Sequence, residues 1–201
     1  QEVMDKVLQG HGRLGNDHPI SPKNRFHNDD LEQRAYDPDK AKWYLKQSGI
    51  SNLEVPLHAA DAAFPGAVDA AVLYKEQAEK AGITINVVRE PNDGYWSNVW
   101  MKEPWSAVYW SGRVTEDWMF TTAYAADASW NDTFWKHERF NKLLVEARAE
   151  LDPEKRRQMY YEMQKIVRNQ GGTVVPMFAN YVFAVSDKVQ HDGTLAGNWN
   201  L

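Results

Sequence analysis

Cysteine is absent from this chain of 201 residues, which excludes disulfide bonds, thiol catalysis and cysteine-ligated metals. No apolar run approaches the roughly 18 residues of a membrane-spanning helix. The first eight residues read as a short amphipathic helix and not as a signal peptide, although the chain is also compatible with a processed piece. Positive charge is scarce, because 23 lysines and arginines face 28 aspartates and glutamates, a formal net charge of −5. This balance argues against a nucleic acid or an anionic membrane surface as partner.

Sequence motifs of catalysis and metal binding are also missing. The six histidines are scattered without metal-ligand spacing, and neither a nucleophile elbow nor a glycine-rich phosphate loop occurs. His11 and His18 are interpreted as surface or loop-packing residues. Glu116 and Asp117 could in principle perform acid–base chemistry, but adjacent carboxylates are common on solvated faces and at helix starts. We therefore expect no catalytic residue, no metal and no cofactor.

The pattern of apolar residues predicts an α/β fold. Residues 53–88 read as strand, helix and strand, the unit that builds parallel sheets, and residues 106–110 as a third strand. Asp37 and Pro38 are typical of a helix start. Two long helices follow, one with a stripe from Phe140 to Leu151 and the other starting at Asp152-Pro153. Residues 173–178 and 181–185 are predicted to be strands, and residues 10–36 a long surface loop.

Aromatic residues are concentrated in one part of the chain. Seven of the nine tryptophans lie between residues 96 and 135, at positions 96, 100, 105, 110, 118, 130 and 135. Trp96, Trp100 and Trp105 are interpreted as core packing. Trp110 and Trp118 flank a Ser-Gly-Arg turn at a predicted strand end, where open α/β sheets bind ligands, so a site and a core role are weighed equally for them. For the arginine of this turn, Arg113, the alternative to a site role is a surface ion pair with Glu116 or Asp117.

Several weak elements occur together in an informative order. The chain has Val7-Leu-Gln-Gly10, a proline-containing loop, Tyr36-Asp-Pro-Asp-Lys-Ala-Lys42, the strand–helix–strand unit ending in Ala81-Gly-Ile-Thr84, Trp110-Ser-Gly-Arg113, Asp152-Pro153 and Val175-Pro-Met-Phe178. In this order and spacing the chain resembles the large solute-binding proteins of ABC transporters for oligopeptides, dipeptides and nickel (family 5, cluster C). The resemblance covers essentially the whole chain.

The resemblance implies a domain organisation. Members of the family have two lobes that close over the ligand and are more than twice this length. Residues 1–201 resemble only the C-terminal lobe, so we expect a single α/β lobe of a type II (cluster C) periplasmic binding protein fold, with a mixed β-sheet flanked by helices. The N-terminal lobe is expected to be missing, and residues 186–201 to start the crossover back to it.

The same resemblance implies a ligand site. The family's Trp-x-x-Asp turn, whose acidic residue pairs with the ligand's free amine, falls on Trp110, Ser111, Gly112 and Arg113. Arginine in place of the acid favours a carboxylate or phosphate of the ligand, as in a peptide carboxyl end, an acidic conjugate or an opine-like solute. Asp117 would supply a counter-charge, and Trp110 and Trp118 would wall an apolar subsite.

The expected function is therefore that of a periplasmic, or otherwise extracytoplasmic, binding component of an ABC importer. It would capture peptides or related small solutes and deliver them to a membrane permease without catalysing a reaction. Two alternatives stay open on the sequence alone. One is a carbohydrate-active hydrolase, which would require two carboxylates converging across a pocket. The other is an interaction module that uses the aromatic surface against a protein partner.

Overall fold

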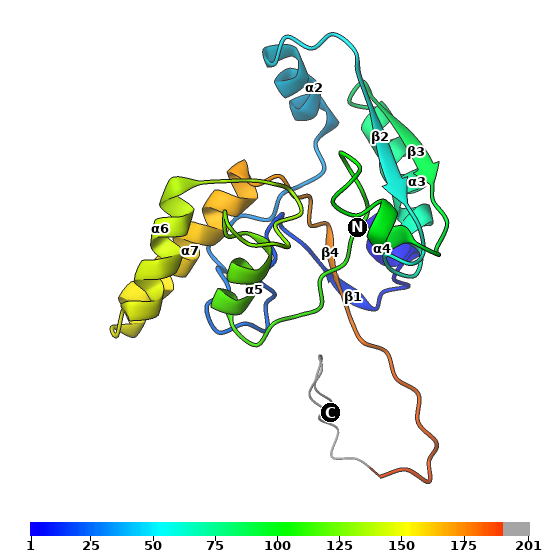
Figure 1. The fold of residues 1–201 in the computed structure, drawn as a ribbon. Coiled ribbons are helices and arrows are strands. Elements are labelled where there is room, and N and C mark those ends of the chain that lie inside the picture. The colour runs from blue at the N-terminus through cyan, green and yellow to red at the C-terminus, as the bar shows by residue number, and fades with distance from the viewer. Residues whose placement is uncertain (191–201) are drawn as a thin grey trace. The chain divides into compact units, whose positions relative to one another are not determined.

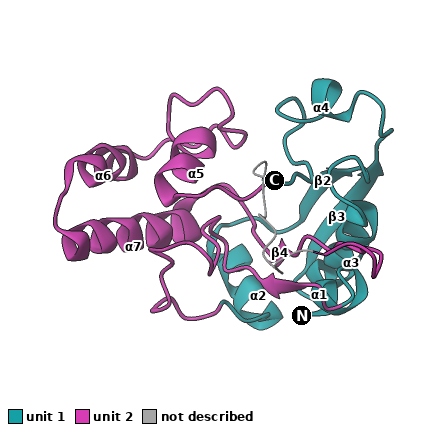
Figure 2. Ribbon diagram, turned by 90° about the horizontal axis from the view of Figure 1, so that it is seen from below, with its two compact units in different colours: residues 1–9, 34–110 teal, residues 10–33, 111–201 magenta. Residues whose placement is uncertain are grey.

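The computed structural model describes residues 1–190, and these divide into two compact units. Unit 1 consists of residues 1–9 and 34–110, and unit 2 of residues 10–33 and 111–190 (Figure 2). The part of the predicted crossover segment beyond residue 190 lies outside the described residues. The prediction that the whole chain forms one lobe stays a prediction, and each unit is described by itself.

Unit 1 contains the predicted strand–helix–strand motif (Figure 1). Strand β2 (Leu53–Ala59) and strand β3 (Ile83–Arg89) are parallel, with Leu53 opposite Ile83 and Ala59 opposite Arg89. Helix α3 (Ala67–Glu79) connects them and buries Ala71 against Leu57, Ala59 and Ile85. Burial of this small apolar face holds the helix on the two-stranded sheet. The helices α1 (Glu2–Lys6), α2 (Pro38–Gln47) and α4 (Tyr95–Asn98) complete the unit.

Helix α2 begins as its sequence predicts but contributes nothing to a core. The Asp37 side chain accepts a hydrogen bond from the Lys40 backbone N–H at 2.8 Å, and Pro38 is the first helical residue. No residue of α2 is buried, and the rings of Trp43 and Tyr44 are more than half exposed. The local capping signals therefore define where this helix begins.

The predicted third strand at residues 106–110 is present only as an isolated parallel bridge between Ser106 and His58. The His58 N–H donates to the Trp105 carbonyl at 3.0 Å, and the Ala107 N–H donates to the His58 carbonyl at 2.8 Å. The next ladder acceptor, the Ala107 carbonyl, instead accepts a hydrogen bond from the buried Tyr95 hydroxyl at 2.7 Å. The prediction of a full strand is wrong because a side chain takes the group that would extend the ladder.

Unit 2 is built from helices and one small sheet. Its helices are α5 (Glu116–Ala123), α6 (Glu138–Ala149) and α7 (Pro153–Gln170). Helices α6 and α7 pack together as the two apolar stripes predict, and their buried residues include Phe140, Leu143, Leu144, Ala147, Met163, Ile166 and Val167. Leu151, which the stripe also included, is 88% exposed because α6 ends two residues before it.

The small sheet of unit 2 pairs strand β1 (Gly12–Leu14) with strand β4 (Met177–Ala179) in antiparallel register. Gly15 follows β1, and a Cβ at this position would lie 2.0 Å from the Val175 carbonyl oxygen, so the close approach requires glycine. The predicted strand at 173–178 is thus confirmed only at its end. Residues 181–185 form no strand and are exposed, so the prediction of a strand there is wrong.

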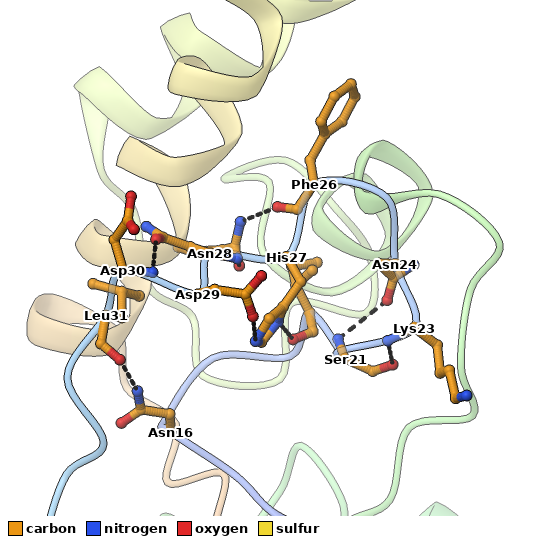
Figure 3. Close-up of polar contacts among 12 residues, drawn as sticks. Asn16, Ser21, Lys23, Asn24, Phe26, His27, Asn28, Asp29, Asp30 and Leu31 are labelled. Atoms are coloured by element: carbon orange, nitrogen blue, oxygen red, sulfur yellow. Dashed lines mark hydrogen bonds and ion pairs between the residues drawn. The ribbon is translucent and has the colours of Figure 1, made fainter. Parts of the chain in front are cut away.

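The segment predicted as a long surface loop, residues 10–36, carries part of the unit 2 core. The side chains of His18, Ile20, Phe26 and Asn28 are buried. The buried amide of Gln164 on α7 donates to the Phe26 carbonyl at 2.7 Å and accepts from the Asn28 N–H at 2.9 Å. Figure 3 shows how the side chains of this segment turn back toward its own backbone. Its polar sequence is therefore ordered by hydrogen bonds as much as by apolar burial.

Candidate functional site

Trp110 lies at the end of unit 1, in a cluster of aromatic rings. Its half-buried ring is 6.3 Å from the ring of Trp100, which is 5.8 Å from that of Trp96, and Tyr109 lies 5.7 Å from Trp96. Trp96 and Tyr109 are 39% and 54% exposed. The interpretation of Trp96 as core packing is wrong, because its ring forms part of an accessible aromatic surface. Such a surface offers apolar contact area with little side-chain entropy to lose.

Arg113 and Trp118 lie together in unit 2. The Arg113 guanidinium lies 5.3 Å from the centre of the Trp118 ring, a cation–π arrangement, and Trp118 is 48% exposed. Arg113 Nη1 donates to the carbonyl and to the hydroxyl oxygen of Ser111, at 2.8 and 2.9 Å. Gly112 is exposed, and a Cβ there would meet no atom within 4 Å. Residues 111–113 form no regular turn, but the segment places the Arg113 guanidinium beside the Trp118 indole at the start of α5.

The start of helix α5 gives its two carboxylates different roles. The Thr115 hydroxyl caps the helix by accepting from the Trp118 N–H at 3.2 Å. Glu116 is only 4% exposed, and its carboxylate accepts from the Phe26 N–H at 2.7 Å. Asp117 forms an ion pair with Arg148 of α6 at 2.7 Å. Glu116 therefore holds the backbone at Phe26 in place, and Asp117 is a counter-charge for Arg148. These roles of the two carboxylates do not favour the alternative of a carbohydrate-active hydrolase.

A pocket of about 410 Å³ opens beside this helix start, entirely within unit 2. It is lined by Arg25, Phe26, Val114, Thr115, Glu116, Asp117, Ala147, Arg148, Arg156 and Tyr160. Burial, together with the charges of Asp117 and Glu116, raises the pKa of Tyr160 to about 12. Its hydroxyl is therefore protonated at neutral pH and available as a hydrogen-bond donor.

A second pocket of about 140 Å³ lies beside β1 and β4 and is lined by His18 and His27 among other residues. Figure 3 shows the His27 ring held between its own segment and Asp29. His27 Nδ1 lies 2.9 Å from the Ile20 carbonyl oxygen, and Nε2 lies 3.7 Å from Asp29. Burial, then the nearby His27 and Arg168, lowers the pKa of His18 to about 4. The interpretation of His18 as a loop-packing residue fits its 1% exposure.

Of the six predicted ligand-binding residues, the structure brings Ser111, Gly112, Arg113 and Trp118 together in unit 2. Asp117 follows in the same helix but faces Arg148, and Trp110 belongs to unit 1. The arginines and the tyrosine of the larger pocket were not predicted from the sequence, since they come from three separate segments of the chain. Within residues 1–190, no group of three or more histidines, aspartates and glutamates is placed to hold a metal ion. No described helix has the length and apolar character of a membrane span.

Known proteins match both the sequence and the fold. A family described as "Bacterial extracellular solute-binding proteins, family 5 Middle" matches residues 1–132. Di/tripeptide-binding protein 1 of Pseudomonas aeruginosa (strain UCBPP-PA14) is 26% identical over 201 residues, which cover 96% of this chain and 37% of that protein. The dipeptide-binding protein of Escherichia coli (strain K12) is 26% identical over 189 residues, which cover 86% of this chain and 34% of that protein. The chain thus spans little more than a third of these relatives.

Solved structures show the same fold at lower identity. NikZ from Campylobacter jejuni, in complex with Ni(L-His), superimposes with a TM-score of 0.75 at 18% identity, over 89% of this chain and 39% of that one. The periplasmic binding protein DppA from Helicobacter pylori, in complex with the peptide STSA, gives a TM-score of 0.73 at 20% identity, over 88% and 36%. These likenesses confirm the predicted α/β fold class, sheets flanked by helices in part of a type II periplasmic binding protein. Together with the match over residues 1–132, they show that the chain belongs to the family 5 bacterial extracellular solute-binding proteins.

Proposed function

We propose that this chain is the C-terminal lobe of an extracytoplasmic solute-binding protein that serves an ABC importer. The family consists of extracellular solute-binding proteins and not of enzymes, and relatives of this chain are named for binding dipeptides and tripeptides. In this proposal the lobe forms one wall of a cleft, a second lobe closes the cleft, and the loaded protein delivers its solute to a membrane permease. The periplasm is the proposed location.

The pairing of Arg113 with the exposed Trp118 ring indicates the class of ligand. A guanidinium beside an indole combines an anion-recognising fork with an apolar platform. The proposed solute is therefore a peptide or small conjugate whose carboxylate binds Arg113 while an apolar group contacts Trp118. Ser111 and Gly112 precede Arg113 in the same segment of unit 2, and the role of Trp110 of unit 1 as a ligand-binding residue stays a prediction.

Asp117 takes a different part in this scheme. Its ion pair with Arg148 neutralises a positive charge at the start of α5. Both side chains are partly exposed, so the pair contributes little to stability. The proposed role of Asp117 is to keep Arg148 in position near the turn.

The test uses a full-length protein that contains this chain, and calorimetric titration with dipeptides. A dipeptide with a free carboxylate is compared with the same dipeptide carrying a carboxamide. We expect Arg113→Ala to weaken binding of the carboxylate form by about tenfold or more, the effect of losing a hydrogen bond to a charged group. Binding of the carboxamide form should hardly change.

The matched control is Arg13→Ala, which removes an exposed arginine from β1 in the same unit. It should leave both affinities unchanged. Equal losses for the carboxylate and the carboxamide in Arg113→Ala would show that Arg113 supports the fold of the turn and does not recognise the ligand. Failure of any peptide or related carboxylate to bind the intact protein would contradict the proposed solute class.

A further inference from the structure

The larger pocket of unit 2 collects arginines from three separate segments of the chain. Arg25 comes from the segment at residues 20–28. Arg148 comes from the end of α6, and Arg156 from the first turns of α7. Two carboxylates, Glu116 and Asp117, also line it. The side chains around the pocket thus carry three positive and two negative charges.

The floor of the pocket is a stack of aromatic rings. The ring of Tyr160 lies 5.5 Å from that of Phe26 at an interplanar angle of 10°, and 6.5 Å from that of Phe120 at 16°. The Arg25 guanidinium lies over the Phe26 ring at 5.1 Å. Phe120 is completely buried and Phe26 is 8% exposed. This packing holds Tyr160 in a fixed position and places Arg25 beside the pocket.

The hydroxyl of Tyr160 is the polar group of this floor. Tyr160 is only 4% exposed as a whole residue, and it lines the pocket. A tyrosine hydroxyl can donate one hydrogen bond and can also accept hydrogen bonds. The Tyr160 hydroxyl can therefore donate to an acceptor group of a molecule in the pocket.

The charged side chains determine which kind of molecule fits. Both carboxylates are already engaged, Glu116 with the Phe26 N–H at 2.7 Å and Asp117 with Arg148 Nε at 2.7 Å. Arg156 Nε donates to the Glu150 carbonyl at 2.8 Å. A guanidinium has five N–H donors in a fork, so Arg148 and Arg156 keep donors for a further acceptor. The pocket thus offers a hydroxyl donor and guanidinium donors, and each of its two carboxylates already accepts a hydrogen bond.

We propose that this pocket is a binding site for a small oxyanion, a carboxylate or a phosphate group, held by Tyr160, Arg148 and Arg156 with Arg25 at its rim. The oxygen atoms of such a group match the guanidinium fork and accept the tyrosine hydroxyl proton. The site uses neither Arg113 nor Trp118, and it does not depend on the solute proposed above.

The test measures thermal unfolding and calorimetric binding with inorganic phosphate and with succinate as probes, each against sodium chloride at equal ionic strength. We expect one probe or both to bind saturably and to raise the melting temperature beyond the chloride reference. Binding of phosphate alone would assign the site to phosphate groups, and binding of succinate alone to carboxylates. If neither binds saturably, the proposal is wrong.

Variants then locate the binding. Tyr160→Phe keeps the ring stack and removes only the hydroxyl, so it should weaken binding by about tenfold. Arg25→Gln removes one charge from an exposed side chain and should also weaken binding. Lys23→Gln is the matched control, because it removes one charge two residues earlier in the same segment and does not line the pocket. If Tyr160→Phe and Arg25→Gln bind like the unmodified protein, or if Lys23→Gln weakens binding as much, the anion binds elsewhere.

Discussion

The side chain of Gln164 holds the backbone of the segment at residues 20–28 in place. Its side chain is completely buried on α7. The amide nitrogen donates to the Phe26 carbonyl at 2.7 Å and to the Tyr160 carbonyl at 3.0 Å, and the amide oxygen accepts from the Asn28 N–H at 2.9 Å. One side chain thus satisfies two backbone groups of a segment that lies far away in the sequence.

Replacing Gln164 by leucine keeps a similar volume and removes these hydrogen bonds. The Tyr160 carbonyl lies within the helix, so the Phe26 carbonyl and the Asn28 N–H are the groups left without partners. Each buried unpaired group costs about 1–3 kcal/mol. We therefore expect Gln164→Leu to lower the free energy of unfolding by about 3 kcal/mol. For a chain of this size that corresponds to a fall in melting temperature of roughly 6–12 °C.

The assay is urea denaturation followed by fluorescence and circular dichroism, with hydrogen exchange of the Asn28 amide as a local measure. Gln158→Leu, the same substitution at an exposed position of α7, is the control and should change stability by less than about 0.5 kcal/mol. Exchange at Asn28 should become faster in Gln164→Leu only. Equal stability of the two variants would show that this segment is held by its apolar residues and that the hydrogen-bond argument is wrong.

Two further predictions concern a buried histidine and a helix cap. Because the folded protein lowers the pKa of His18 to about 4, the unfolded chain binds a proton more readily between that pH and the ordinary value near 6.5. The contribution of His18 to stability is therefore complete above about pH 6.5 and is lost as the pH falls toward about 4. In urea denaturation across this range, the free energy of unfolding of His18→Phe should depend less on pH than that of the unmodified protein. Thr115→Ala removes the oxygen that accepts from the Trp118 N–H and should cost about 1 kcal/mol in urea denaturation, whereas Thr115→Ser should restore most of it; an unchanged Thr115→Ala protein would contradict the cap.

Local rules predicted those parts of the fold in which the chain's own pattern decides the structure. The Asp-Pro starts of α2 and α7 are capped as expected, by Asp37 and Asp152. The unit from β2 to β3 follows from two alternating strands around one helix. In these elements the cap, the apolar period and the stop signal agree, so no distant contact is needed to place them.

The predictions of secondary structure are wrong where a distant side chain or the lack of a partner strand determines the structure. No residue near positions 106–110 predicts that the Tyr95 hydroxyl donates to the Ala107 carbonyl, where the hydrogen-bond ladder with β2 ends. Residues 181–185 have an apolar strand pattern, but in the described part of the chain they pair with no strand. A strand requires a partner, and the sequence of the strand does not supply it.

The candidate site divides in the same way. Arg113 and Trp118 are five residues apart, so the turn and the first turn of α5 bring them together and sequence reasoning finds both. The larger pocket combines Arg25, Arg148, Arg156 and Tyr160, which are separated by more than a hundred residues at the extremes. Only the packing of α6 and α7 against the segment around Phe26 makes them neighbours, and no motif marks that arrangement.

The segment at residues 20–28 connects the core of unit 2 to the turn proposed to bind the ligand. Gln164 fixes Phe26 and Asn28 from α7, and the Phe26 N–H donates to Glu116 in α5. The Asn24 side chain donates to the carbonyl of Arg113 at 3.0 Å. The polar residues that made this segment look like a surface loop are therefore the ones that position the backbone on both sides of Thr115. Gln164→Leu should therefore also disturb Arg113, because the Asn24–Arg113 and Phe26–Glu116 hydrogen bonds connect residues 20–28 to the start of α5. A changed ligand affinity of the Gln164→Leu variant would show this connection.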